Sequence, residues 1–167
     1  QSGAHRHTTH IEQERRREVM QYQGQRGRYP PRREQRPPSL PLGYLASGYF
    51  DSAENVLPEV IVDWAKDIAY KLYMGKMATA QLRKFFGEVR RIELKLSQVD
   101  DFEQVRPEIL KLIAYANDAV KKNKAPALFN EFMKQNITWA ARGKKEFLKG
   151  FVNHFECIVG FFPKTRD

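Results

Sequence analysis

Apolar residues recur at three- and four-residue steps through most of the sequence after residue 58, and this period constrains the fold more than any other feature. Such spacing places successive apolar side chains on one side of an α-helix, where they can be buried together. No two-residue alternation typical of a half-buried strand appears, and no internal repeat. The sequence therefore predicts an all-α protein, a compact bundle of about five helices.

Prolines, glycines and capping residues divide the apolar pattern into these helices. Pro58 suits the first turn of the first helix, and Thr79 and Asp101 are expected to be the N-caps of the second and third. The fourth helix is predicted to follow Pro126 and to stop near Gly143, and the fifth occupies most of the remaining sequence.

The composition changes near residue 40, and the change predicts two regions. Residues 1–40 carry all of their positive charge on arginine, are interrupted by prolines and offer almost nothing to bury. We expect them to be a disordered Arg/Pro-rich extension. Residues 41–167 are expected to be the helical bundle domain, which begins with an extended lead-in that packs on the bundle. The side chains expected to pack are Tyr44, Leu45, Tyr49 and Phe50.

The charge balance indicates the class of partner. The sequence has 29 Lys+Arg against 20 Asp+Glu, a formal net charge of +9, which favours phosphate-bearing or acidic partners. No apolar run approaches the ~18 residues of a membrane span, so no membrane partner is expected. Cys157 is the only cysteine, which excludes an intrachain disulfide and fits a reducing compartment. No charged-then-apolar export signal opens the sequence, and we expect a cytoplasmic protein.

Helical geometry separates the cations of the second predicted helix into two groups. Arg83 and Arg90 share one flank of the buried sector, and Gly87 between them would let a bulky partner approach the backbone. The opposite side carries Lys84, Arg91 and Lys95. Glu88 lies within reach of two of these, so that side is expected to be an ordinary solvated face. Arg83 and Arg90 are therefore the better candidates for phosphate contact.

The sequence ARGKK supplies a second candidate. It places Arg142, Lys144 and Lys145 at the expected start of the fifth helix. Cations are locally unfavourable there, whereas a bound phosphate would be held by both the side chains and the free N–H groups. The glycine spacing and the Ser/Thr of a P-loop are absent.

No set of residues points to catalysis. His154 and Cys157 are three residues apart on the fifth helix, but no further Cys or His lies near them in the sequence. No combination of nucleophile, base and charge stabiliser emerges. We therefore predict no enzyme activity, no metal and no cofactor.

Three segments resemble the small helical subunit of type III-A CRISPR effector complexes (the Csm type). The most specific is TAQLRKFFGEVRRIE at 79–93, and the others are ILKLIAYA at 109–116 and FVNHFECIVGFF at 151–162. The sequence LGYLASGYFD also looks like the lead-in of that family. The resemblance covers roughly residues 42–162 and leaves out the Arg-rich start.

The resemblance implies a non-catalytic subunit that stacks in several copies along the effector complex. Its partners would be the guide RNA and the target RNA, other subunits of the complex and copies of itself. Sequence readout is left to base pairing, so the protein needs charge without base specificity. The RNA-backbone contacts would be Arg83, Arg90, Arg142, Lys144 and Lys145. A stripe of small residues is expected to pack against a helix of this subunit or of a neighbour, and the resemblance implies that it serves subunit stacking. Its members are Gly150, Asn153, Cys157 and Gly160.

Two other functions remain open from the sequence. The chain could be a free-standing RNA-binding protein that uses its Arg-rich arm, with the bundle as an anchor. It could also be a protein-interaction helical bundle whose charge has no nucleic-acid role. Removing residues 1–40 separates the first alternative from the subunit, because only an arm-driven binder should lose RNA.

Overall fold

The structure is a computed structural model, and it describes residues 36–164. Helices are the only regular elements in this range apart from one isolated bridge between Phe50 and Val56. The elements are α2 (Pro58–Ile61), α3 (Asp63–Met74), α4 (Thr79–Val99), α5 (Phe102–Lys121), α6 (Ala127–Ala140), the π-helix η1 (Glu146–Val152) and α7 (Asn153–Phe161). Because α2 continues almost directly into α3, and η1 into α7, the predicted all-α bundle of about five helices is confirmed.

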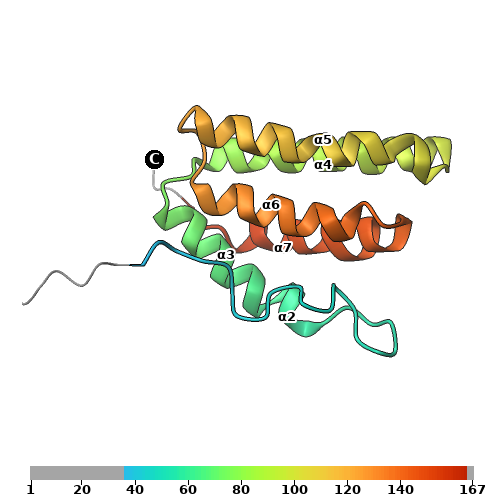
Figure 1. Ribbon diagram of the computed structural model, residues 1–167, viewed down its shortest axis with the longest axis horizontal. Helices are drawn as coiled ribbons and strands as arrows, with labels where there is room; N and C mark the ends of the chain where they lie inside the picture. Colours follow the sequence, from blue (N-terminus) through green and yellow to red (C-terminus); the bar gives the residue numbers. More distant parts are fainter. Residues whose placement is uncertain (1–35, 165–167) are drawn as a thin grey trace, which may run out of the picture. The chain divides into compact units, whose positions relative to one another are not determined.

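Short connections make α4 and α5, α5 and α6, and α6 and η1 antiparallel neighbours. In Figure 1, α4 and α5 run side by side as one long pair, and α6 lies beside η1 and α7. The bundle is closed by packing of α5 on α6, α4 on α7 and α3 on α7. The predicted Arg-rich extension falls mainly on residues 1–35, which lie outside the described range, and the boundary after residue 40 stays a prediction.

A cluster of aromatic rings forms the centre of the core. Phe155 is fully buried and packs edge-on against Phe132 and Phe151, with centroids 5.6 and 5.8 Å apart. Phe86 stacks on the same ring at 5.5 Å, but it is only half-buried. Phe85, its neighbour on α4, is buried against Phe129. Phe86 therefore lies at the edge of the core, whereas the other rings of the cluster are buried inside it.

The predicted helix starts are partly confirmed. Pro58 begins α2, and the Asp101 side chain caps α5 by accepting a hydrogen bond from the Glu103 N–H at 3.0 Å. The predicted N-cap at Thr79 is wrong, because Ala78 occupies the cap position and Thr79 is already helical. The Thr79 hydroxyl is buried without a hydrogen-bond partner, so its capping capacity is not used.

A chain of buried hydrogen bonds attaches the lead-in to the bundle. The Tyr44 hydroxyl lies 2.6 Å from His154 Nε2, and His154 Nδ1 lies 2.5 Å from the Val60 carbonyl oxygen. A carbonyl can only accept, so Nδ1 carries the proton and Nε2 accepts from Tyr44. The Asn136 amide donates to the Tyr44 hydroxyl and accepts from the Tyr49 hydroxyl, both at 2.8 Å. The predicted packing of the lead-in is therefore confirmed, with polar contacts that the sequence did not suggest.

The network makes stability depend on pH through His154. Burial lowers the pKa of this imidazole from 6.5 to about 4, so the folded protein keeps it neutral while the unfolded chain binds a proton below pH 6.5. Stability from this group is complete above the unfolded pKa and is lost as the pH falls towards the folded pKa. Lowering the pH from about 7.5 to about 4.5 should therefore cost about 2.5 kcal/mol of unfolding free energy through His154 alone.

Urea denaturation at the two pH values measures this loss, and His154→Gln is the control because it cannot titrate. The variant should start less stable but lose about 2.5 kcal/mol less than the natural protein over the same pH interval. An equal loss in both proteins would show that His154 does not carry the effect.

The π-helix lies where the lead-in crosses the last helix. The Tyr49 ring lies directly on Gly150 in η1, so that a Cβ at position 150 would overlap the ring. Gly160 has no atom within 4 Å of its Cβ position and is exposed. The predicted stripe of small residues is therefore not one helix-packing surface, since Gly150 packs on the lead-in. The physical reason is that η1 interrupts the 100° rotation per residue that the prediction assumed.

This difference between two glycines is testable in stability. Gly150→Ala should lower the unfolding free energy by about 1–3 kcal/mol or more, because either the ring or the helix must move. Gly160→Ala should leave it unchanged or raise it by up to about 1 kcal/mol, because alanine is the better helix former. Chemical denaturation of the two variants gives the comparison, and equal effects would contradict the contact with Tyr49.

Candidate RNA-contacting surfaces

The predicted flank of α4 is open to solvent. Arg83 and Arg90 are exposed, and a Cβ added at Gly87 would meet no atom within 4 Å. Arg90 forms an ion pair with Glu93 at 2.8 Å, and its guanidinium lies 5.6 Å from the centroid of the Phe86 ring. Within residues 36–164, Arg83 has no ion-pair or hydrogen-bond partner. Arg83 is therefore the cation of this flank that is most available to a phosphate.

The opposite side of α4 is not simply a solvated face. Arg91 bonds to Glu88 at 3.2 Å, and it also reaches Glu108 of α5 at 3.2 Å. Lys95 pairs with the same Glu108 at 3.0 Å, and this contact, followed by that with Arg91, lowers the pKa of the Glu108 carboxyl. These cations link α4 to α5. Lys84, which was grouped with them, takes no part in the link.

The cations of the ARGKK sequence each have an intramolecular partner. Lys144 Nζ lies 2.6 Å from Asp100 Oδ1, and this hydrogen bond lowers the pKa of the Asp100 carboxyl. Lys145 pairs with Glu54 at 3.2 Å. The Arg142 guanidinium lies 3.7 Å from the centroid of the Trp139 ring. Carboxylates from distant segments thus neutralise two of the cations at the start of this helix.

Arg83 and the contact of Lys144 lie at opposite ends of α4. Arg83 is in the first turns of the helix, whereas Lys144 pairs with the residue that follows its last turn. At a rise of 1.5 Å per residue, the positions of Arg83 and Asp100 are about 25 Å apart along the axis. The structure therefore does not bring the five predicted residues into one site. It separates them into two surfaces.

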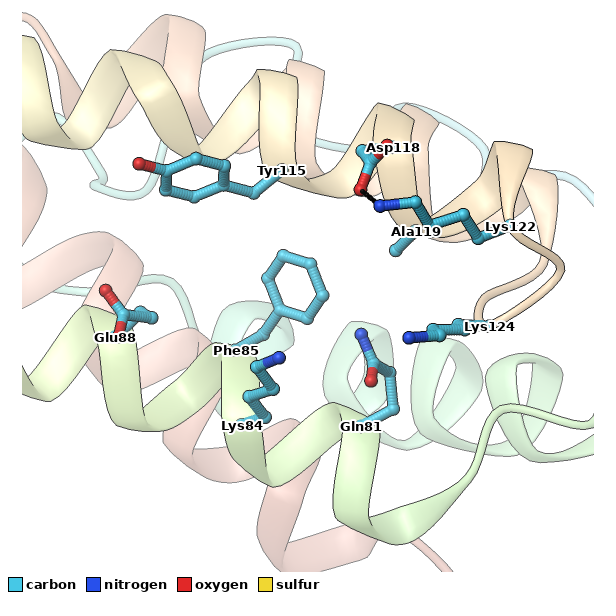
Figure 2. A pocket seen from close by; sticks show the side chains of 9 residues that line it. All are labelled: Gln81, Lys84, Phe85, Glu88, Tyr115, Asp118, Ala119, Lys122 and Lys124. Atoms are coloured by element: carbon cyan, nitrogen blue, oxygen red, sulfur yellow. Dashed lines mark hydrogen bonds and ion pairs between the residues drawn. The ribbon is translucent and has the colours of Figure 1, made fainter.

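A groove between α4 and α5 was not singled out from the sequence. Its volume is about 380 Å³, and Figure 2 shows the Phe85 ring reaching between the two helices. The lining side chains are Gln81, Lys84, Phe85, Glu88, Tyr115, Asp118, Ala119, Lys122 and Lys124. The available signal was Tyr115, a large aromatic residue that lies outside the apolar stripe of its helix.

The residues considered for metal or acid–base chemistry lie apart from these surfaces. His154 is fully buried and uses both ring nitrogens in the lead-in network. Cys157 is half-buried, and burial raises the pKa of its thiol. Residues 36–164 contain no group of three His, Cys, Asp or Glu residues placed to hold a metal ion. His154 therefore serves to hold the lead-in, and Cys157 packs at the edge of the core.

Comparison with known protein families shows to which family the chain belongs. The family model described as Csm2 Type III-A matches residues 57–165, which comprise every helix from α2 to α7. The chain belongs to the Csm2 type III-A family. Membership confirms the resemblance to the small subunit of type III-A CRISPR complexes, although the match begins after the lead-in. No curated protein and no solved structure matches the chain significantly. None of the helices between residues 36 and 164 has the length and apolarity needed to cross a bilayer.

Proposed function

We propose that the chain works as a non-catalytic small subunit that contacts the backbone of the guide–target RNA duplex without sequence specificity. The observation that carries the proposal is the family match over the whole helical bundle, combined with an open cationic flank on α4. Contacts to phosphate require charge and access but no base-specific donors, and Arg83 beside Gly87 offers both. The proposal includes a cytoplasmic location, with which the single cysteine is consistent.

The intramolecular partners suggest an order among the proposed contacts. Arg83 contacts phosphate first, because no carboxylate has to be displaced within the described residues. Arg90, Lys144 and Lys145 are held by exposed or half-exposed carboxylates. Surface pairs of this kind are worth about 0–1 kcal/mol, so a phosphate can replace the carboxylate at small cost. Arg142 stays stacked on Trp139 and offers the outer edge of its guanidinium.

Contacts with other subunits and with copies of itself are the second part of the proposal. Tyr70 and Met74 on α3 are exposed, as is Phe161 on α7, and α3 packs against α7. Large exposed apolar side chains on packed neighbouring helices are typical of surfaces that bury against a partner. This observation supports protein contact within the complex, and it equally favours the alternative of an interaction bundle without an RNA role.

The proposal predicts how RNA affinity depends on Arg83. Arg83→Ala should weaken the binding of unrelated RNA sequences alike, and should make the log–log salt dependence shallower by about 0.7 for single-stranded RNA. Lys134→Ala is the control, because Lys134 is exposed on α6, away from α4. Fluorescence anisotropy at several salt concentrations, on the complete chain, measures both slopes. Equal effects of the two substitutions would contradict a specific contact surface on α4.

Assembly is tested by co-purification. A tagged chain expressed together with a type III-A system should co-purify CRISPR-derived guide RNA and the other subunits, identified by RNA sequencing and mass spectrometry. Deleting residues 1–40 should leave this association intact. Loss of RNA with that deletion would favour the arm-driven RNA-binding protein, and subunits without any guide RNA would favour the protein-interaction bundle.

A further inference from the structure

We infer that the groove between α4 and α5 accepts one unpaired nucleotide of an RNA strand, with the base against Tyr115 and the phosphate on Lys84 and Lys124. The inference deepens the proposed function, on which it rests for RNA as the ligand. It adds a site of a different kind, because a pocket for a base is not needed for backbone contact.

The aromatic part of the groove is suited to a flat ring. Tyr115 on α5 is 49% exposed, which leaves much of its side chain available for stacking. Phe85 on α4 also lines the groove, and Phe129 packs edge-on behind it at a centroid distance of 4.7 Å. Phe85 is therefore a fixed apolar wall. Aromatic surfaces of this kind bind any nucleobase, since every base has a π-face.

The groove contains lysines that no carboxylate neutralises within the described residues. Asp118 pairs with Lys122 at 2.7 Å, and Glu88 bonds to Arg91 outside the groove at 3.2 Å. Lys84 and Lys124 have no ion-pair partner within residues 36–164. A bound phosphate would therefore meet two ammonium groups whose charge is not already satisfied.

The remaining polar groups favour a nucleotide over a simple anion. Gln81 presents an amide that can donate to and accept from the edge of a base. The carboxylates of Glu88 and Asp118 would repel a small anion that has no other contacts, but they can accept hydrogen bonds from exocyclic amines. The volume of about 380 Å³ falls in the range of small-molecule sites.

The groove is separate from the flank that carries Arg83 and Arg90. At 100° per residue, Gln81, Lys84 and Glu88 point on average roughly 140° away from the direction shared by Arg83 and Arg90. Substitutions in one surface therefore leave the other unchanged, and the two parts of the RNA contact can be tested independently.

The test compares a short single-stranded RNA with the same strand in abasic form, titrated by anisotropy at low salt against the complete chain. Tyr115→Leu should weaken binding of the base-bearing RNA by roughly 5-fold or more and leave the abasic strand unaffected. Tyr115→Phe should bind like the natural protein, because it keeps the ring. Leu110→Ala, which removes an exposed apolar side chain from α5 outside the groove, is the control and should change nothing.

A second arm uses adenosine monophosphate and inorganic phosphate as probes, with two-dimensional NMR as the readout. The nucleotide should shift the signals of Gln81 and Lys124, and Lys124→Gln should reduce that shift. Equal shifts with phosphate alone would reduce the groove to an anion site and overturn the inference. Equal affinity for base-bearing and abasic RNA would overturn it as well.

The two proposals fail in different ways. If Tyr115→Leu is selective but Arg83→Ala has no effect, the groove stands and the backbone surface on α4 is wrong. If Arg83→Ala weakens both strands and Tyr115→Leu weakens neither, the backbone contact stands and the groove is wrong. If the natural protein binds neither strand nor the nucleotide, both are wrong.

Discussion

The buried contacts of His154 hold together segments that the helical periodicity alone would leave independent. Through Val60 the imidazole is joined to α2, and through the Tyr44 hydroxyl it is joined to the lead-in. Asn136 of α6 continues this series of hydrogen bonds, because it bonds to the hydroxyls of both Tyr44 and Tyr49. Every donor has an acceptor in an apolar interior, so losing one member leaves others unpaired at a cost of about 1–3 kcal/mol each. The arrangement thereby fixes where the lead-in crosses the bundle.

The parts of the fold that were predictable depend on short-range signals. The apolar stripe of α4 and the cap at Asp101 involve residues within a few positions of one another, and both were identified from spacing. The contact between Tyr44 and His154 joins residues 110 positions apart, and neither residue carries a local sign of it. The π-helix escaped prediction because its apolar residues fit a regular helix almost as well.

For the candidate sites too, the sequence predicted what depends on one helix but not the ion pairs between distant segments. Helical rotation correctly placed Arg83 and Gly87 on an open flank, since that depends on one helix only. It could not show that Glu108 of α5 takes up two cations of α4, or that Asp100 meets Lys144 across 44 positions. Lys84 was therefore grouped with paired residues although it lines the groove. A count of the acidic residues on the same helix therefore misses the carboxylates that other segments place beside its cations.

The close approach of Tyr49 to Gly150 has a consequence for how related sequences can diverge. A ring at position 49 excludes every side chain at position 150, so position 150 can become larger only where that ring is lost. The family match begins at residue 57, after the lead-in that carries this ring. In relatives that lack an equivalent of Tyr49, the glycine is no longer required, and larger residues should appear there. The packing of the Tyr49 ring thus couples a position in the lead-in to a position in η1.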